Sequence, residues 1–159
     1  MSLSRVTIFL IIFIFICFSN GIGQESKVEL QNDVNIELLG RCLLYSFSYQ
    51  RLINPTFGLE LGVSVLGGSN NSISFFTGGG RFYLLNNNAT PCISGGIVVI
   101  TAPFNTVSFS DDHNSTSYGY IGPGFEYRSP DGFILRGTIY FLLRDGFFVW
   151  PGAQVGVAF

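Results

Sequence analysis

Charged residues are scarce in this 159-residue chain, at 11% of the total, whereas ordinary globular proteins carry roughly 25%. Hydrophobic residues make up 47% of the chain and aromatic residues 16%. A soluble domain with so few charged side chains could not cover its surface with polar groups. The composition therefore favours a protein that contacts lipid over an ordinary soluble domain.

Basic residues are few as well. The chain has eight Lys and Arg residues, which do not cluster, and its net charge is −2. Proteins that bind nucleic acid need a basic patch or stripe to contact phosphates. This composition excludes a nucleic-acid partner.

The chain also lacks a long hydrophobic run after its N-terminal region. The run from Val6 to Phe18 is shorter than the roughly 20 residues of a membrane-spanning helix. Arg5 precedes it, and small residues follow as far as Gly23. This layout predicts a signal peptide at residues 1–23, followed by a short periplasmic segment at residues 24–33, and a retained N-terminal anchor is the alternative.

Only three cysteines occur, and Cys17 lies in the apolar run. Ile16 stands where a lipoprotein signal would carry a small residue, so we do not expect lipidation of Cys17. Cys42 and Cys92 could pair in an oxidising compartment. The strand order below places them at opposite ends of the fold, so we expect no disulfide between them.

The hydrophobic residues of the mature chain recur at every second position. Between Phe57 and Leu66, large apolar residues alternate with Gly, Ser and Glu. Such alternation predicts β-strands. The predicted strands are Val34–Leu39, Leu43–Gln50, Phe57–Leu66, Ser74–Leu85, Cys92–Thr101, Tyr118–Arg128, Phe133–Leu143 and Phe148–Phe159.

The connections between these strands indicate their arrangement. Short turns are expected after even-numbered strands, and the longer polar segments Gly67–Ser72 and Phe104–Ser117 follow odd-numbered ones. Outer-membrane barrels have short periplasmic turns and longer outer loops. We therefore predict an all-β antiparallel up-and-down transmembrane barrel over residues 34–159. The count of eight depends on dividing the first segment at Gly40-Arg41, because without that division it is seven.

Closure explains why such strands would survive in lipid. Every backbone polar group in a bilayer must find a partner within the protein, so a spanning sheet must close. One face of each predicted strand is almost entirely Leu, Val, Ile, Phe and Tyr, and the other is rich in Gly, Ser and Thr. A soluble sandwich or a lipocalin-like barrel is the alternative, although its outward face would carry more Lys and Glu.

Strand alternation directs six charged side chains towards the lumen of this barrel. Eight strands enclose only enough room for side chains, and confined charges are costly unless they are paired. We therefore expect a plug of Glu–Arg pairs rather than an open pore, with Glu60 and Arg81 as one couple, unless some members lie solvated at the rims. The expected lumen charges are Glu37, Glu60, Arg81, Glu126, Arg128 and Arg136.

The last residues resemble the C-terminal assembly signal of outer-membrane proteins. Val155, Val157 and Phe159 alternate in a strand that ends in Phe, although Gln154 stands where that signal usually has glycine. The segments 44–51, 57–62 and 148–152 are similar to those of small, uncharacterised outer-membrane barrels. The resemblance implies a bacterial outer-membrane location, contact with lipid, and recognition by the barrel-assembly machinery. It implies no common substrate.

Aromatic residues and prolines give two further expectations. Tyr118, Tyr120, Phe147 and Trp150 are expected at the outer rim, where aromatic rings settle at lipid headgroups. Pro123 and Pro151 each remove a backbone donor from a strand. Each is therefore expected to mark a bulge or a strand end.

No catalytic, cofactor or metal constellation stands out. His113 and Ser115 resemble part of the His–Ser–Glu set of lipid A deacylases, but the nearest downstream acid, Glu126, is expected most of a strand away. Asp111 and Asp112 alone form a weak cation motif. We expect a non-enzymatic barrel with a filled lumen and a structural or surface-interaction role. The alternatives are an outer-leaflet lipid-modifying enzyme and a small-ligand or transport barrel.

Overall fold

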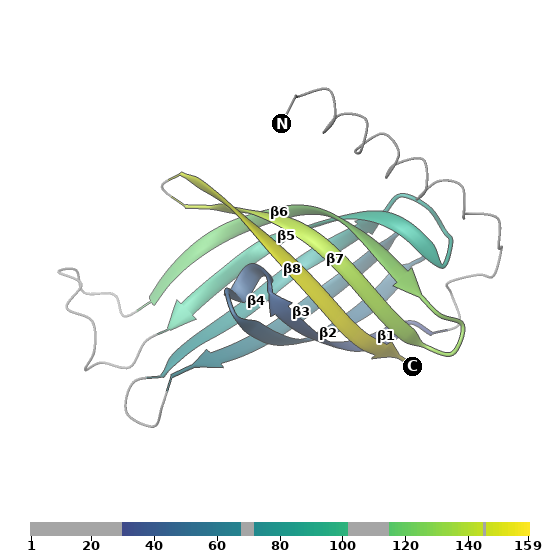
Figure 1. Cartoon of the computed structure of the whole chain (residues 1–159), viewed down its shortest axis with the longest axis horizontal. Helices are drawn as coiled ribbons and strands as arrows, with labels where there is room; N and C mark the ends of the chain where they lie inside the picture. The colour runs from purple at the N-terminus through teal and green to yellow at the C-terminus, as the bar shows by residue number, and fades with distance from the viewer. Residues whose placement is uncertain (1–29, 68–71, 102–114, 145) are drawn as a thin grey trace, which may run out of the picture.

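The computed structural model describes residues 30–67, 72–101, 115–144 and 146–159. The expected signal peptide and residues 24–29 of the segment after it lie outside these ranges. Within them the chain forms eight strands and one short 3-10 turn (Figure 1). The elements are β1 (Asn32–Leu39), η1 (Gly40–Cys42), β2 (Tyr45–Asn54), β3 (Phe57–Leu66), β4 (Ile73–Tyr83), β5 (Ala89–Thr101), β6 (Ser115–Arg128), β7 (Phe133–Leu143) and β8 (Phe147–Ala158).

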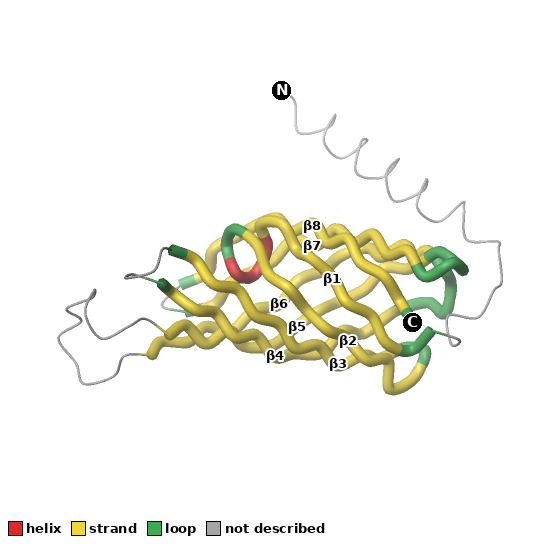
Figure 2. Tube along the Cα trace, turned by 90° about the horizontal axis from the view of Figure 1, so that it is seen from below, coloured by secondary structure: helices red, strands yellow, loops and turns green. Residues whose placement is uncertain are grey.

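The strands form a closed barrel in which each strand pairs antiparallel with its sequence neighbours. β1 and β8 close the sheet, with Val34 opposite Val157. At this seam the Asn32 amide donates to the Phe159 carbonyl at 3.1 Å. Figure 2 shows the strands running obliquely around the long axis of the barrel. The predicted fold class and strand count are confirmed.

The division at Gly40-Arg41 is also correct. β1 ends at Leu39, the turn η1 occupies Gly40–Cys42, and β2 begins at Tyr45. Leu39 and Leu43 flank this turn with φ angles of 59° and 74°, a region that bulky side chains rarely adopt. All three residues of η1 are buried, so this strained hairpin folds its tip into the barrel.

The two ends of the barrel differ in their connections. The loop end carries the β1–β2, β3–β4, β5–β6 and β7–β8 connections, and the turn end carries the other three together with the start of β1 and the end of β8. The expected asymmetry holds for the β3–β4 and β5–β6 connections. It is wrong for the β1–β2 and β7–β8 connections, which are tight hairpins as short as the turns at the other end.

Alternation along the strands separates two environments. On β7 the side chains of alternate residues are buried in the lumen, and those between them are exposed on the outer wall. The buried members are Ile134, Arg136, Thr138, Tyr140 and Leu142. The exposed large hydrophobic members are Phe133, Leu135, Ile139 and Leu143. The same division recurs around the barrel, so polar groups face inward and apolar groups face outward.

β4 and β5 approach each other closely at a pair of glycines. Gly79 lies opposite Gly96, and a Cβ added to Gly96 would stand 2.6 Å from the Gly79 Cα atom. The Tyr120 hydroxyl would lie 2.9 Å from the same added Cβ. Glycine is therefore needed at position 96 because backbone and a lumen tyrosine occupy the space.

The expectation that each of the two prolines marks a bulge or a strand end is wrong, since Pro123 lies within β6 and Pro151 within β8. The pairing register is the same on both sides of Pro123 and Pro151, so neither makes a bulge. Pro123 instead falls where the β6–β7 ladder is interrupted. Pro151 lies beyond Gly152, where the β1–β8 ladder stops. The missing backbone donors therefore coincide with gaps in pairing.

Candidate functional site: a buried ion-pair network

Among the residues that the structure describes, the lumen contains equal numbers of acidic and basic side chains. All of them are 3% exposed or less. A charged side chain buried this deeply is very costly in free energy unless it has a partner of opposite charge. The acids are Asp33, Glu37, Glu60 and Glu126, and the bases are Arg41, Arg81, Arg128 and Arg136. All six residues expected from the sequence lie in this set, and Asp33 and Arg41 are additions.

Glu60 and Arg81 form the couple expected from the sequence. Glu60 Oε2 lies 3.0 Å from Arg81 Nη2, across the neighbouring strands β3 and β4. The other carboxylate oxygen, Oε1, accepts a hydrogen bond from Arg41. Glu60 therefore bridges two arginines, one from the wall and one from the hairpin tip.

Arg41 was expected only as the point where the first segment divides. In the structure η1 carries it into the lumen, where its Nε donates to Glu37 Oε2 at 3.1 Å. Its Nη1 donates to the Tyr120 hydroxyl at 3.1 Å. Because η1 interrupts the strand alternation, a period-two pattern could not assign Arg41 to a face.

Asp33 was expected in the periplasmic segment at residues 24–33, but β1 begins two residues earlier than the predicted strand and includes it. Its carboxylate pairs with Arg128, and with Arg136 at 3.2 Å. Asp33 has the same parity as Glu37 on β1. Extending the predicted alternation by one position, from Val34 to Asp33, would have found it.

Glu126 lies where several partners converge. It pairs with Arg136 of the neighbouring strand and with Arg128 at 3.3 Å. Arg81 Nη1 is 4.0 Å away, and the Tyr83 hydroxyl donates to Glu126 at 2.7 Å. These contacts continue the chain of ion pairs from Arg41 and Glu60 to Asp33 and Arg128.

Gln154 links different parts of this network without adding charge. Its Oε1 accepts from Arg81 Nη1 at 3.3 Å and from Arg136 Nη1 at 3.2 Å. Its Nε2 donates to Glu37 Oε1 at 3.0 Å. This explains why the terminal motif departs from glycine at position 154: the glutamine side chain points into the lumen and satisfies three charged groups.

Two apolar clusters lie above and below the network. The cluster at the loop end contains Cys42, Phe75, Val98, Tyr120, Tyr140 and Leu142. The cluster at the turn end contains Leu52, Tyr83 and Cys92. Cys42 and Cys92 are thus in separate clusters and are not joined by a disulfide, as expected.

The rim assignment of the aromatic residues is wrong for three of four. Tyr120 is buried in the lumen, and the Tyr118 hydroxyl donates to the Arg41 carbonyl. Trp150 packs against the loop-end cluster, and its Nε1 donates to the Leu43 carbonyl at 3.2 Å. On β6 and β8 these three residues alternate in step with the inward-facing side chains of the same strands, so strand alternation predicts that they face the lumen. Phe147 alone is strongly exposed, at 73%.

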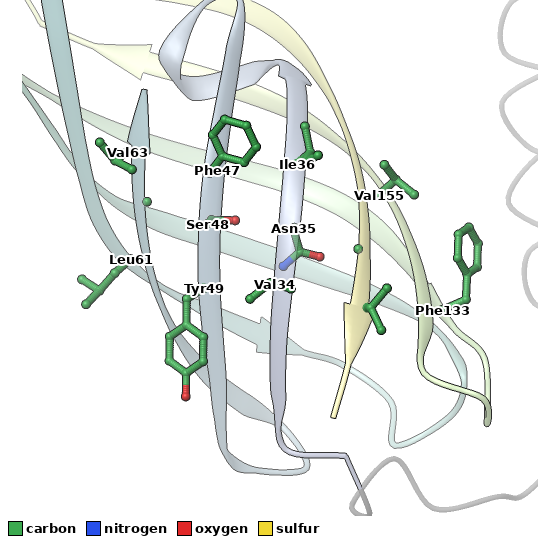
Figure 3. Close-up of a pocket in the computed structure, with 13 residues that line it drawn as sticks. Val34, Asn35, Ile36, Phe47, Ser48, Tyr49, Leu61, Val63, Phe133 and Val155 are labelled. Carbon is green, nitrogen blue, oxygen red and sulfur yellow. The ribbon is translucent and has the colours of Figure 1, made fainter. Parts of the chain in front are cut away.

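The outer wall carries a broad apolar groove of about 830 Å³. It runs along β1 between ridges formed by β2 and β3 on one side and by β7 and β8 on the other (Figure 3). The outward side chains lining it are Val34, Ile36, Phe47, Tyr49, Leu61, Val63, Phe133, Val155 and Val157. The groove is therefore a concave part of the apolar wall, and Val155 and Val157 of the terminal motif belong to it.

The other expected candidates lie mostly beyond the described residues. His113, Asp111 and Asp112 fall in residues 102–114, outside the described ranges. Within those ranges no group of three His, Cys, Asp or Glu side chains could hold a metal ion. No helix in the described part of the chain is long and apolar enough to cross a membrane.

A closed eight-stranded antiparallel barrel with a polar, filled lumen and an apolar outer wall is the fold of small outer-membrane proteins. The chain is similar to the crystal structure of the N-terminal β-barrel domain of Pseudomonas aeruginosa OprF. The TM-score is 0.62 and the identity 16%, over 85% of this chain and 100% of that one. It also matches Yersinia pestis Ail in a phospholipid bilayer nanodisc, with a TM-score of 0.49 and 11% identity, over 82% of this chain and 100% of Ail. No protein-family profile matches the chain, and no curated protein sequence does. The similarity to OprF shows the fold.

Proposed function

We propose that the protein is a non-enzymatic β-barrel of the bacterial outer membrane, with a structural role and surface interactions through its loop end. The observation that carries this proposal is the charge-balanced network that fills the lumen of an otherwise apolar-walled barrel. The network links β1, β3, β4, β6 and β7, so it braces the wall from inside.

The outer wall supports a location in lipid. Large hydrophobic side chains are exposed on every strand, and many are about half exposed. Soluble monomers rarely expose apolar patches beyond a few hundred Å². A wall that is apolar around the whole barrel suits hydrocarbon, and closure satisfies the backbone groups that lipid cannot. The bacterial outer membrane is proposed because the fold is that of outer-membrane barrels.

The network also supports a structural role over a catalytic one. Glu126, the acid of the deacylase-like alternative, is held by Arg136 and Arg128 and accepts from Tyr83. A carboxylate held this way already has its oxygens engaged, whereas the acid of a catalytic triad must be available to orient the base. Incubation with labelled lipid A tests the alternative: hydrolysis that is lost on His113→Ala would replace the structural proposal with an enzymatic one.

Heat-modifiability is the first experiment for the proposed function. Membranes from expressing cells are separated by density, and the protein is run on a gel with and without boiling. We expect the protein in the outer-membrane fraction and a different migration of the unboiled band, because a closed barrel resists detergent until it is heated. Recovery in the soluble fraction without a shift would overturn the proposal in favour of a soluble barrel.

We also propose that the assembly machinery recognises Val155, Val157 and Phe159. Their side chains all face outward and are 43%, 55% and 59% exposed, so a partner could contact them before lipid does. We expect Phe159→Ser to lower the amount of barrel in the outer membrane while leaving refolding of the purified protein into detergent intact. Equal loss in both assays would make Phe159 a stability residue instead.

A further inference from the structure

On the described strands, the outer wall of the barrel carries a single charged side chain. Arg51 is exposed on β2, where it alternates in step with the outward-facing Phe47 and Tyr49. The other charged side chains of these strands all face the lumen. No described acid forms an ion pair with Arg51. Within the described part of the chain, its guanidinium is therefore available to a group outside the protein.

Arg51 lies near the turn end of the barrel, close to the end of β2 at Asn54. Exposed aromatic side chains mark the same end of the wall at Phe82, Tyr127 and Phe133, each at or next to a strand end. Outer-membrane barrels carry aromatic girdles at the membrane interfaces, where an arginine on the lipid face costs far less than at the midplane. We therefore expect Arg51 at the level of the lipid headgroups and their phosphates.

The apolar groove along β1 leads to Arg51. Val34 and Tyr49, which are paired, are the lining residues of β1 and β2 nearest to the turn end. The next outward-facing pair in that direction is Asn32 and Arg51. Directly opposed side chains on neighbouring strands have Cβ atoms about 5 Å apart. The turn end of the groove therefore has a guanidinium and an amide side by side.

The amide of Asn32 is positioned to act with Arg51. The Tyr49 hydroxyl donates to Asn32 Oδ1 at 2.7 Å, which holds this side chain in place. Asn32 Nδ2 makes one long hydrogen bond, of 3.5 Å, to the Phe159 carbonyl. An amide nitrogen has two donors, so one remains for a ligand. Arginine binds phosphate through two parallel N–H donors, and the two side chains together suit a phosphate group.

The groove gives an alkyl chain more contact than a flat part of the wall would. Phe47 and Leu61 form a ridge on one side, Phe133 stands on the other, and Val34 and Ile36 form the floor (Figure 3). Each atomic contact adds a small dispersion attraction. A chain that lies between the ridges contacts protein on three sides. The groove is open along the wall, so a chain enters it directly from the bilayer.

We propose that the groove and Arg51 form a binding site for an anionic glycerophospholipid, with phosphatidylglycerol as the type, in the leaflet at the turn end. One acyl chain lies in the groove along β1, and the phosphate accepts hydrogen bonds from Arg51 and Asn32. On the described strands no acidic side chain faces outward to bind the ammonium of a zwitterionic headgroup, so a headgroup with net negative charge fits better. This site rests on the proposed membrane location of the barrel.

Photolabelling of the purified protein in phosphatidylcholine nanodiscs tests the site. The probe, at a small constant fraction, is phosphatidylglycerol with a diazirine near the middle of one acyl chain, and labelled residues are mapped by mass spectrometry. We expect labelling at Ile36, Phe47 or Val155 that falls when unlabelled phosphatidylglycerol replaces part of the phosphatidylcholine. Phosphatidylethanolamine in the same amount should leave this labelling in place. Labelling near the exposed Ile97 on β5 should respond to neither lipid.

Matched variants separate the headgroup contact from the chain contact. Arg51→Gln should weaken phosphatidylglycerol binding by roughly two- to fivefold, the effect of one exposed charge pair. Arg144→Gln at the loop end should leave binding unchanged. Val34→Trp should block the groove and remove the competed labelling, whereas Ile139→Trp, on the outer face of β7, should preserve it.

The heat-dependent gel shift checks that each variant still forms the barrel. Equal competition by phosphatidylethanolamine and phosphatidylglycerol would overturn the proposed site, and so would competed labelling that either Arg51→Gln or Val34→Trp leaves unchanged. A folded barrel in the outer-membrane fraction would then still support the proposed function. Recovery of the parent protein in the soluble fraction would instead overturn both proposals.

Discussion

Single residues decide the balance of charge inside this barrel. Each buried carboxylate contacts at least one arginine, and Glu60, Asp33 and Glu126 each contact two or more. Removing one partner of a buried ion pair costs more free energy of unfolding than the intact pair contributes, because the other charge stays buried without a partner. Loss of any one of these acids is therefore expected to destabilise the fold.

Glu126→Gln tests this dependence. The change keeps the shape of the side chain but removes the charge that faces Arg136 and Arg128, so we expect a loss of about 3–5 kcal/mol in the free energy of unfolding. Urea titration of the barrel in lipid vesicles measures it, with the fluorescence of Trp150 as the signal. Asp131→Asn, in an exposed turn, should change stability by less than roughly 0.5 kcal/mol. Equal stabilities of the Glu126 variant and the parent protein would show that the network is energetically dispensable.

Residue-level interpretation of the sequence succeeded where alternation was unbroken. The lumen positions of Glu37, Glu60, Arg81 and Arg136 follow from the parity of their strands. Arg41 was missed because a 3-10 turn has no period-two pattern. The role of Gln154 was missed because the residue is uncharged, although its parity in the last strand is that of the lumen.

At the scale of elements, the pairing of β4 with β5 leaves no room for a side chain at one position. Gly96 lies opposite Gly79, and a Cβ on Gly96 would meet the Gly79 backbone and the Tyr120 hydroxyl. The sequence shows both glycines but not that they are opposite each other, since register depends on the whole sheet. The strands were predictable, but this close approach was not.

Gly96→Ala tests whether that close approach matters. The added methyl group would meet the Gly79 backbone, so we expect destabilisation of roughly 1–3 kcal/mol, the usual cost of overpacking. Gly137→Ala provides the control, since an added Cβ there has no atom within 4 Å. It should be neutral or slightly stabilising, because glycine is unfavourable in a strand. The same urea titration compares the two variants. Equal stabilities would mean that β4 and β5 can move apart to accept the added methyl group at no cost in free energy.

For the whole molecule, the side chains that fill the described part of the lumen lead us to expect no continuous aqueous path through the barrel. Apolar clusters lie at both ends of the ion-pair network, and eight strands enclose little more than side chains. The sequence predicted this plug from its charges and the strand count. The positions at which the β1–β8 and β2–β3 ladders stop, at Leu39 and Phe47, could not be predicted, because they depend on the pairing of the whole sheet.

Planar-bilayer recording tests the plugged lumen. We expect the purified barrel to insert without uniform conductance steps, whereas a sixteen-stranded porin under the same conditions conducts through its water-filled channel. Insertion is verified separately by protease protection of the strands. Reproducible steps from the parent protein would contradict a filled lumen.

The seam between β1 and β8 has a consequence for how the molecule is made. Asn32 and Phe159 meet across a sequence separation of 127 residues, so the first strand gains its second neighbour only after β8 has been synthesised. Every shorter nascent chain has two open sheet edges, and open edges invite aggregation. We therefore expect biogenesis of the proposed outer-membrane barrel to need a factor that keeps the chain from associating wrongly until its last strand has been made.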